Sequence, residues 1–325
     1  MLINPLPYMA DPFEPLTDEP VRDKLPFKEC RTLVDGDPFV YAAGFSVEHN
    51  EPIAYTKDGK FVGHWVKKSE FNAWCKKHPD RAANIDFDNL DTLHWVEDFD
   101  KCRLILRNKK KQINTAVRGA KQAWFLTKGS TLWRNDDATI QGYKDNRKDM
   151  EKPVYYDDIR SFMEKAFKAT VCQGLEADDS MASAARNNVG RVIVCSPDKD
   201  LRTVMGYHLN PNKMKEGVVY VTELEACRNL YIQMLMGDRI DNIKGLSGDR
   251  QKSGWGIKTS TAAISQFITE GDMAKFVAQE YERKYPDGVM AEDGITHLTW
   301  QEMLCETANL LFLRRYQHTK FTWGD

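Results

Sequence analysis

The stretch "GRVIVCSPDKDL", residues 190–201, decides the fold class. Its β-branched run, Arg191 to Cys195, predicts a short buried strand. The strand leads directly into Asp198 and Asp200. Ligand sites of parallel sheets lie just beyond the carboxyl ends of the strands, so acids at this position are typical of such a site. Other strands that end in acids would place further carboxylates at the same edge of the sheet.

Further strands are expected on both sides of this stretch, at residues 31–34, 123–127 and 217–222. The first of them ends at Asp35. The segments between the strands have helical periodicity, for example in the apolar residues that follow Pro153, which are Val154, Ile159, Phe162, Met163 and Phe167. Strands that alternate with helices predict an α/β fold whose mostly parallel sheet is flanked by helices. After about Gly237 we expect only helices and turns.

Two features of the first half do not fit this alternation. "PIAYTKDGKFVGHWV", residues 52–66, alternates apolar and polar residues around Asp58-Gly59, which predicts a hairpin. Residues 102–122 carry seven cations and no acid, with helical character up to about Ala120. Such a run is most often a solvated helix face, and contact with nucleic acid is the alternative.

The composition is that of a water-soluble globular protein. The 325 residues are 42% hydrophobic and 29% charged, with a net charge of −2, and no apolar run has the length of a membrane span. The seven cysteines are scattered without a CxxC pair, which favours reduced thiols over a zinc site. The acidic, proline-rich opening, residues 1–20, has neither signal-peptide nor transit-peptide character, so we expect an irregular arm there.

Acidic residues gather in four groups at the ends of the expected elements. The groups are Asp35; Glu176, Asp178 and Asp179; Asp198 and Asp200; and Asp238 and Asp241. Any one group could be a turn or a helix cap. Together they would not stay ionised at one sheet edge without compensation, and oxygen ligands suit Mg²⁺ or Mn²⁺. Two such ions about 3.5–4 Å apart can clamp the attacking and leaving oxygens of a phosphodiester.

A glycine-rich segment, residues 235–263, gives an independent signal. Its glycines bracket tight turns between two expected helices, and a lysine and two hydroxyl residues open the second helix. These residues are Gly245, Gly248, Gly254, Gly256, Lys258, Thr259 and Ser260. Backbone amides at such a helix start form a good phosphate cradle, and a plain helical hairpin with a glycine-rich loop is the alternative.

With these features the sequence resembles the metal-dependent 5′-nucleases, the family of flap endonucleases, polymerase 5′-nuclease domains and phage 5′→3′ exonucleases. The matching pieces are "LVDGD", "WRND…YKDNR", "GLEADD", "CSPDKDL" and "LMGDRIDNIKGLSG…GIKTSTAA", which span residues 31–263. They follow the family's order and are specific as a set. The closing "ANLLFLRRYQHTKFTW" is most similar to the exonucleases of short-tailed phages.

The resemblance implies a PIN-like α/β core, a helix–three-turn–helix motif that grips duplex DNA, at times through K⁺, and a helical C-terminal part. It assigns Asp35, Glu176, Asp178, Asp198 and Asp200 to a first metal, with Asp179 in support, and Asp238 and Asp241 to a second. Lys144 and Arg147 would contact the scissile phosphate. Tyr143 would stack on a terminal base and Arg134 would contact backbone phosphate, although packing or surface roles are about as plausible for these two.

The corresponding division of the chain is an arm at 1–30, a catalytic core at 31–237 and a DNA-binding and C-terminal helical region at 238–325. Within the core, residues 46–120 are an insertion without a counterpart in the family, and 134–170 form an arch region. One departure matters most. The family usually has an aspartate at the end of the second strand, where this chain has Thr127, Lys128 and Gly129. Asp136 and Asp137 lie too far along the chain to replace it simply.

We therefore expect a Mg²⁺-dependent 5′→3′ exonuclease, with Mn²⁺ able to substitute. It would act on duplex DNA with a 5′ end or flap, and also on RNA–DNA primers, in phage or bacterial replication and recombination. Its expected setting is the cytoplasm of a bacterial host, as a monomer that replication proteins could bind, with no membrane contact. Two alternatives stay open: a catalytically weakened DNA-structure-binding protein on the same scaffold, and a PIN-type ribonuclease, which the duplex-binding motif disfavours.

Overall fold

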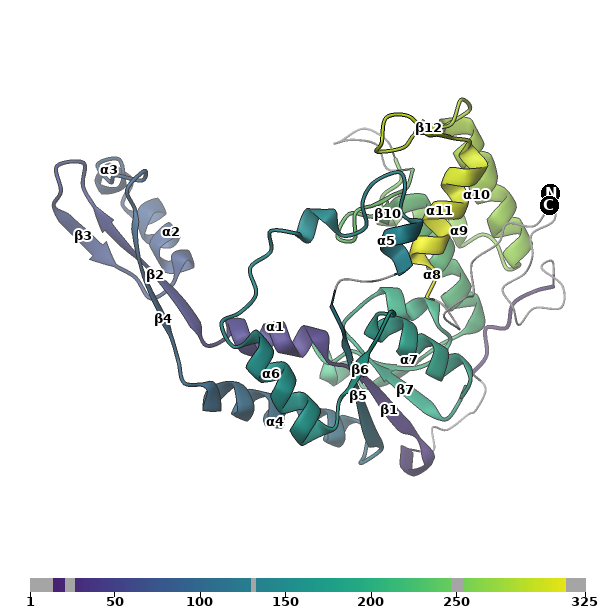
Figure 1. Ribbon diagram of the computed structural model, residues 1–325, viewed down its shortest axis with the longest axis horizontal. Helices are drawn as coiled ribbons and strands as arrows, with labels where there is room; N and C mark the ends of the chain where they lie inside the picture. The colour runs from purple at the N-terminus through teal and green to yellow at the C-terminus, as the bar shows by residue number, and fades with distance from the viewer. Residues whose placement is uncertain (1–13, 21–26, 130–132, 247–253, 314–325) are drawn as a thin grey trace. The chain divides into compact units, whose positions relative to one another are not determined.

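The computed structural model describes residues 14–20, 27–129, 133–246 and 254–313 (Figure 1). The chain divides into two compact units, each built from more than one segment. Unit 1 contains residues 1–37, 112–150 and 166–325, and unit 2 contains residues 38–111 and 151–165. The expected insertion at 46–120 therefore falls mostly in unit 2. The expected core at 31–237 is divided between the two units, and the expected C-terminal region at 238–325 belongs to unit 1.

Unit 1 is built on a six-stranded sheet with the strand order β6-β5-β1-β7-β8-β9. The strands are β1 (Arg31–Asp35), β5 (Lys121–Thr127), β6 (Thr170–Cys172), β7 (Val192–Cys195), β8 (Gly206–Leu209) and β9 (Val218–Val221). All neighbours pair in parallel except β8 and β9, which are antiparallel. The predicted α/β class with a mostly parallel sheet is confirmed. The strands β6 and β8 were not predicted, because each is short and follows no long apolar run.

The register of the three central strands aligns their carboxyl ends. Asp35 of β1 pairs with Phe125 of β5, and Val34 pairs with Cys195 of β7. The residues directly after these strands therefore meet at one edge of the sheet. This edge receives the side chain of Asp35 and the segments that begin at Ser196 and Thr127.

Helices cover the sheet and build a second core in unit 1. They are α4 (Phe99–Ala116, which crosses into unit 2), α5 (Trp133–Asp137), α7 (Ala177–Arg186), α8 (Glu223–Met236), α9 (Ile257–Ile264), α10 (Glu270–Lys284) and α11 (Trp300–Leu311). The helix α7 packs on β1, β5 and β7, because Met181, Ala182 and Ala185 bury one apolar face against them. The helices α8 to α11 enclose a separate apolar core. None of the helices in the described ranges combines the length and apolarity that a membrane span needs.

The expectation that strands end near Gly237 is wrong in detail. Two short antiparallel pairs follow: β10 (Gly237–Asp238) with β11 (Ile243–Lys244), and β12 (Val289–Met290) with β13 (His297–Leu298). Each strand has two residues, which is too short to leave a periodic signal in the sequence. The first pair holds the loop that carries Asp238 and Asp241.

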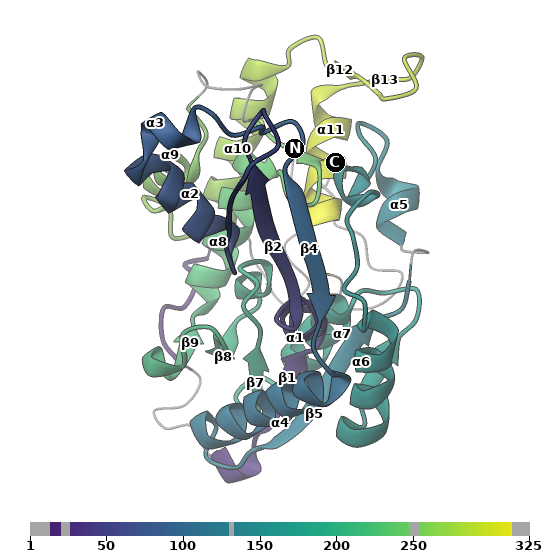
Figure 2. The same cartoon turned by 90° about the vertical axis from the view of Figure 1, so that its left-hand side faces the viewer.

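Unit 2 contains a three-stranded antiparallel sheet with the order β3-β2-β4, and Figure 2 shows β2 and β4 side by side. Its elements are α1 (Asp37–Phe45, which begins in unit 1), β2 (Glu48–Tyr55), β3 (Phe61–His64), α2 (Lys68–Lys77), α3 (Pro79–Ala82), β4 (Asp91–Val96) and α6 (Tyr156–Phe162). The predicted hairpin around Asp58-Gly59 is confirmed by β2 and β3. Ala54, Phe71 and Ile85 form the small core between this sheet and the two helices α2 and α3.

Candidate metal centre

Three carboxylates cluster where α7 begins. Glu176 is the N-cap of the helix, and Asp178 and Asp179 lie in its first turn. One ligand oxygen from each lies within 4.8 Å of the others, and no other acid, histidine or cysteine group of three in the described ranges is this compact. The Thr127 hydroxyl, at the end of β5, accepts the N–H of Ala177 at 2.9 Å and so fixes the helix start against the sheet. The first-turn position also favours negative charge.

Arg134 is the internal counter-ion of this cluster. Its Nη1 lies 2.8 Å from Glu176 Oε2 and 2.7 Å from Asp179 Oδ2, and its Nη2 lies 2.9 Å from Asp179 Oδ1. Its Nε donates to the carbonyl of Leu310 at 2.9 Å. The side chain is only about 1% exposed. Burial opposes the charge of Arg134, but the nearby carboxylates outweigh it and raise the pKa of the guanidinium further.

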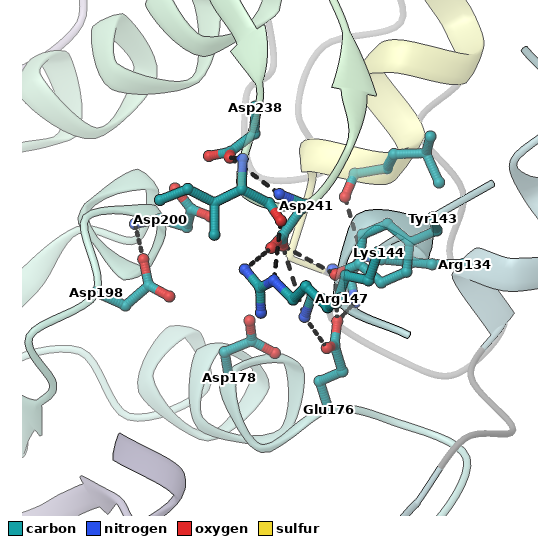
Figure 3. Close-up of polar contacts among 12 residues, drawn as sticks. Arg134, Tyr143, Lys144, Arg147, Glu176, Asp178, Asp198, Asp200, Asp238 and Asp241 are labelled. Atoms are coloured by element: carbon teal, nitrogen blue, oxygen red, sulfur yellow. Dashed lines mark hydrogen bonds and ion pairs between the residues drawn. The ribbon is translucent and has the colours of Figure 1, made fainter. Parts of the chain in front are cut away.

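The segment after α5 brings one tyrosine and two cations to the same acids (Figure 3). The Tyr143 hydroxyl lies 2.8 Å from Glu176 Oε2 and 3.1 Å from Asp241 Oδ2. The Lys144 amine donates to Glu176 and lies 3.6 Å from Asp241 Oδ2, while Arg147 Nη2 lies 2.5 Å from Asp241 Oδ1. The N–H of Lys144 also donates to the carbonyl of Asp241 at 2.9 Å. Backbone and side chains together therefore hold this segment against the loop that follows β10.

A second group of acids lies beyond β7 and β10. Asp198 and Asp200 follow β7, and the Asp200 Oδ1 accepts an N–H from Gln233 of α8 at 2.8 Å. Asp238 accepts the backbone N–H groups of Ile240 and Asp241. Lys199 Nζ lies 2.7 Å from Asp238 Oδ2 and 3.9 Å from Asp200 Oδ1, so this lysine bridges the two chain segments.

Asp35 lies at the sheet edge between these groups. It is buried, and the Ser196 hydroxyl donates to its Oδ2 at 2.8 Å. Burial and then the charges of Asp37 and Asp198 raise the pKa of Asp35 to about 7. Burial and the charge of Asp198 similarly raise the pKa of Asp200 to about 7. Both carboxyls therefore hold a proton more tightly than an ordinary aspartate.

The acids respond to their surroundings in two different ways. Burial and the charges of Glu176 and Asp179 raise the pKa of Asp178 well above its usual range. Burial would also raise the pKa of Glu176, but Arg134, Lys144 and Tyr143 outweigh it and lower that pKa. Burial and Lys199 act in the same opposed way on Asp238, and its pKa is lowered. The cationic partners of Glu176 and Asp238 thus favour their ionised forms, whereas Asp35, Asp178 and Asp200 resist ionisation. Burial also raises the pKa of Asp241, although Lys144 and Arg147 oppose it.

This donor set fits hard divalent cations. Every candidate ligand is a carboxylate oxygen, which Mg²⁺ and Mn²⁺ prefer over the nitrogen and sulfur ligands of zinc. A cation among Asp35, Asp178 and Asp200 would supply the positive charge that their raised pKa values call for. Asp179 differs from these three, because both of its oxygens contact Arg134.

The glycine-rich segment is described only in part, and Gly248 lies outside the described residues. Gly256 is the N-cap of α9, and Lys258 and Thr259 are exposed in its first turn. Ser260 is buried, and its hydroxyl has no hydrogen-bond partner among the described residues, so its expected phosphate contact stays a prediction. A side chain at Gly245 would lie 2.2 Å from the Gly237 nitrogen, whereas Gly254 and Gly256 face open space. Gly245 therefore serves close packing, and among the glycines that the structure describes here Gly254 and Gly256 face outward.

Two expected DNA contacts take internal positions instead. Arg134 was expected to reach backbone phosphate, and Tyr143 to stack on a terminal base, but the structure buries both side chains against Glu176. In this structure neither offers a surface to DNA, because the carboxylates of the acid cluster attract their polar ends inward. Both residues thus take the packing role that their sequence context left open.

Three residues of the site were missed from the sequence: Asp37, Ser196 and Lys199. Ser196 and Lys199 lie within the "SPDKD" stretch, so their position next to Asp198 was the available signal. Asp37 was visible in "DGD" but is also typical of a turn. The contact between Asp37 and β5 depends on how the strands pair, which the local sequence does not indicate.

No protein-family model and no curated protein matches this sequence. Among solved structures, the chain is similar to the T5 D15 protein co-crystallised with metal ions, with 15% identity, a TM-score of 0.47, and coverage of 87% of this chain and 89% of that one. It is also similar to a bacteriophage T5 D15 flap endonuclease complex with DNA and metal ions, with 14% identity, a TM-score of 0.37, and coverage of 66% and 92%. The catalytic core of Rad2 in complex with DNA substrate is similar with 13% identity, a TM-score of 0.44, and coverage of 94% and 86%.

Proposed function

We propose that this protein is a divalent-metal-dependent 5′-nuclease that hydrolyses phosphodiester bonds of DNA with 5′→3′ polarity. The observation that carries the proposal is that acids from three separate chain segments lie around Lys144 and Arg147 (Figure 3). Asp35, at the end of β1, joins them through its hydrogen bond with Ser196. Some of these carboxylates resist ionisation, and others nearby are paired with cationic side chains. Together they form a suitable site for two divalent ions. Mg²⁺ is the expected ion, with Mn²⁺ as a substitute.

We expect separate residues of the site to bind the metal ions and the scissile phosphate. Asp35, Glu176, Asp178, Asp198 and Asp200 would hold one ion, and Asp238 and Asp241 the other. When bound, the ions supply Lewis-acid charge and provide a nucleophile from water at neutral pH. Lys144 and Arg147 would bind and orient the scissile phosphate and stabilise the charge that develops on it. In this structure the same two cations contact Glu176 and Asp241, so phosphate and acids compete for them.

The outward-facing start of α9 is the proposed grip on duplex DNA. Gly256 leaves the backbone amides open, and Lys258 and Thr259 are exposed beside them. Helix N-termini with such neighbours bind phosphate well. A helix–three-turn–helix with K⁺, flap cleavage, removal of RNA primers and a role in phage or bacterial replication are finer parts of the same proposal.

A 5′-labelled duplex incubated with Mg²⁺ or Mn²⁺ tests the proposal directly. We expect mononucleotides or short products to be released from the 5′ end, and none in the presence of a chelator. The double variant Asp198→Ala/Asp200→Ala should lose cleavage while still binding the duplex. Native protein that cleaves with neither ion, or a double variant with undiminished cleavage, would sink the proposal.

One observation favours a second function on the same scaffold. Thr127 stands where the family has an acid, and its hydroxyl caps α7 rather than offering a charge. A protein with a weakened first metal site would bind flapped DNA without cutting it. Flap binding that persists while turnover is negligible with both ions would identify this function, and rapid turnover would exclude it.

A further inference from the structure

The side chain of Asp37 lies at the end of β5, although Asp37 belongs to a distant part of the chain. It directly follows β1 and opens α1, two residues after Asp35. Its Oδ2 accepts the N–H of Thr127 at 2.9 Å. Since β1 and β5 pair in parallel, this contact brings the Asp37 carboxylate to the position beyond β5. The chain itself supplies only Thr127, Lys128 and Gly129 at that position.

One residue separates Asp37 from Asp35, an acid of the proposed first metal. Asp35 is buried, and within the described part of the chain it forms no direct ion pair, its hydrogen bond being to Ser196. A divalent ion held by both Asp35 and Asp37 would offset the repulsion between the two carboxylates.

Thr127 forms hydrogen bonds at the position where an acid would carry charge. Its hydroxyl accepts the Ala177 N–H, and its own N–H is bound by Asp37. The two residues therefore connect the start of α1, the end of β5 and the start of α7, and the first and last of these lie beside the proposed ligands Asp35 and Asp178 in the chain. A carboxylate that binds a neighbouring backbone amide in this way is oriented as well as charged.

We propose that Asp37 supplies the carboxylate that the end of β5 lacks, and that it takes part with Asp35 in holding the first divalent ion. This inference rests on the proposed nuclease function and identifies one more residue of its metal centre. The opposing view is that Asp37 only anchors the β5 end through the Thr127 amide. Asparagine separates the two views, because it can still accept that N–H but carries no charge.

Titration of metal-free protein with Mn²⁺, followed by electron paramagnetic resonance in the absence of DNA, is the decisive measurement. We expect Asp37→Asn to weaken Mn²⁺ binding by about 10–100-fold. Asp86→Asn is the matched control, since Asp86 of unit 2 also accepts backbone N–H groups, from Asp88 and Asn89. An Asp37→Asn variant that binds Mn²⁺ as tightly as the control overturns the inference.

The double variant Asp37→Asn/Thr127→Asp moves the charge to the position that the family uses. It should regain most of the lost Mn²⁺ affinity, and a double variant as weak as the single one counts against the inference. The binding measurement needs no cleavage, so the two proposals fail separately. Native protein that binds Mn²⁺ through Asp37 but never cuts DNA would refute the nuclease and retain the inference.

Discussion

Arg134 and Asp179 form a two-pronged ion pair inside the protein, with Nη1–Oδ2 and Nη2–Oδ1 distances of 2.7 and 2.9 Å. The same guanidinium contacts Glu176 and the carbonyl of Leu310. It therefore joins the start of α7 to the end of α11. Both oxygens of Asp179 are therefore paired with Arg134. Asp178, in the same helix turn, has a raised pKa, so a further cation would stabilise its ionised form.

Removal of the Arg134 charge should destabilise the metal-free protein. Arg134→Gln leaves Glu176 and Asp179 buried without their cation, and we expect a loss of about 3–5 kcal/mol in the free energy of unfolding. Urea unfolding with and without Mg²⁺ measures it, and Mg²⁺ should recover part of the loss. Arg103→Gln is the control, because its exposed pair with Asp100 should contribute less than about 1 kcal/mol. Equal losses in the two variants would contradict the internal role of Arg134.

Lys144 should affect metal binding and cleavage in opposite directions. Its amine contacts Glu176 in this structure, so Lys144→Met removes a competitor of the divalent ion and should tighten metal binding. The same change removes a phosphate contact and should lower kcat by about 10²–10³-fold. Isothermal titration with Mn²⁺ and single-turnover cleavage measure the two effects. Lys148→Met, which removes an exposed partner of Asp145, should change neither. Parallel losses of binding and cleavage in Lys144→Met would argue against this role.

Divalent-metal binding should weaken as the pH falls from 7 to 5. The pKa values of Asp35 and Asp200 are raised to about 7, so both carboxyls are increasingly protonated below that pH and protons compete with the ion. If the ion displaces one proton on binding, its affinity should weaken about tenfold for each unit by which the pH is lowered. Displacement of two protons should give a steeper fall. Mn²⁺ titrations at several pH values test this. A flat profile from pH 5 to 7 would show that these carboxyls do not bind the ion.

The same raised pKa values predict how the metal-free protein responds to pH. A carboxyl whose pKa is higher in the folded state stabilises the fold fully below its ordinary pKa of 3.8 and loses that contribution as the pH rises toward 7. These two groups should therefore lower the melting temperature between pH 4 and 7, and Mg²⁺ should offset the decline. Asp35→Asn should flatten the profile, and Asp58→Asn, on the exposed hairpin, should not. An unchanged slope in Asp35→Asn would contradict the assignment.

Gly245 and Gly254 should respond differently to alanine. The new methyl group at Gly245 would meet the backbone of Gly237 at 2.2 Å, while at Gly254 it would meet open space. We expect Gly245→Ala to cost about 1–3 kcal/mol of stability through overpacking, and Gly254→Ala to cost little. Thermal unfolding of the two variants compares them directly. Similar melting temperatures would show that the β10–β11 pair tolerates a wider spacing than this structure has.

Much of the site could be predicted because its acids are tied to local patterns. Asp35 and Asp198 follow apolar strands, and Glu176 begins a helix, so each position follows from its own neighbours in the sequence. Parallel pairing then brings strand ends together at one edge. The same reasoning failed for Arg134 and Tyr143, whose partners lie 45 and 33 residues further along the chain. No local pattern encodes whether a cation near a helix points inward or outward.

Local sequence patterns predict the α/β class, the central strands, the hairpin around Asp58-Gly59 and the candidate metal acids. These features depend on short-range periodicity and on residues at element ends. The tertiary structure decided which acids are paired, which resist ionisation and which carboxylate lies beside Thr127. The physical reason is that charge and desolvation depend on distance in space. Strand pairing sets that distance between Asp37 and Thr127, residues that are 90 positions apart in the chain.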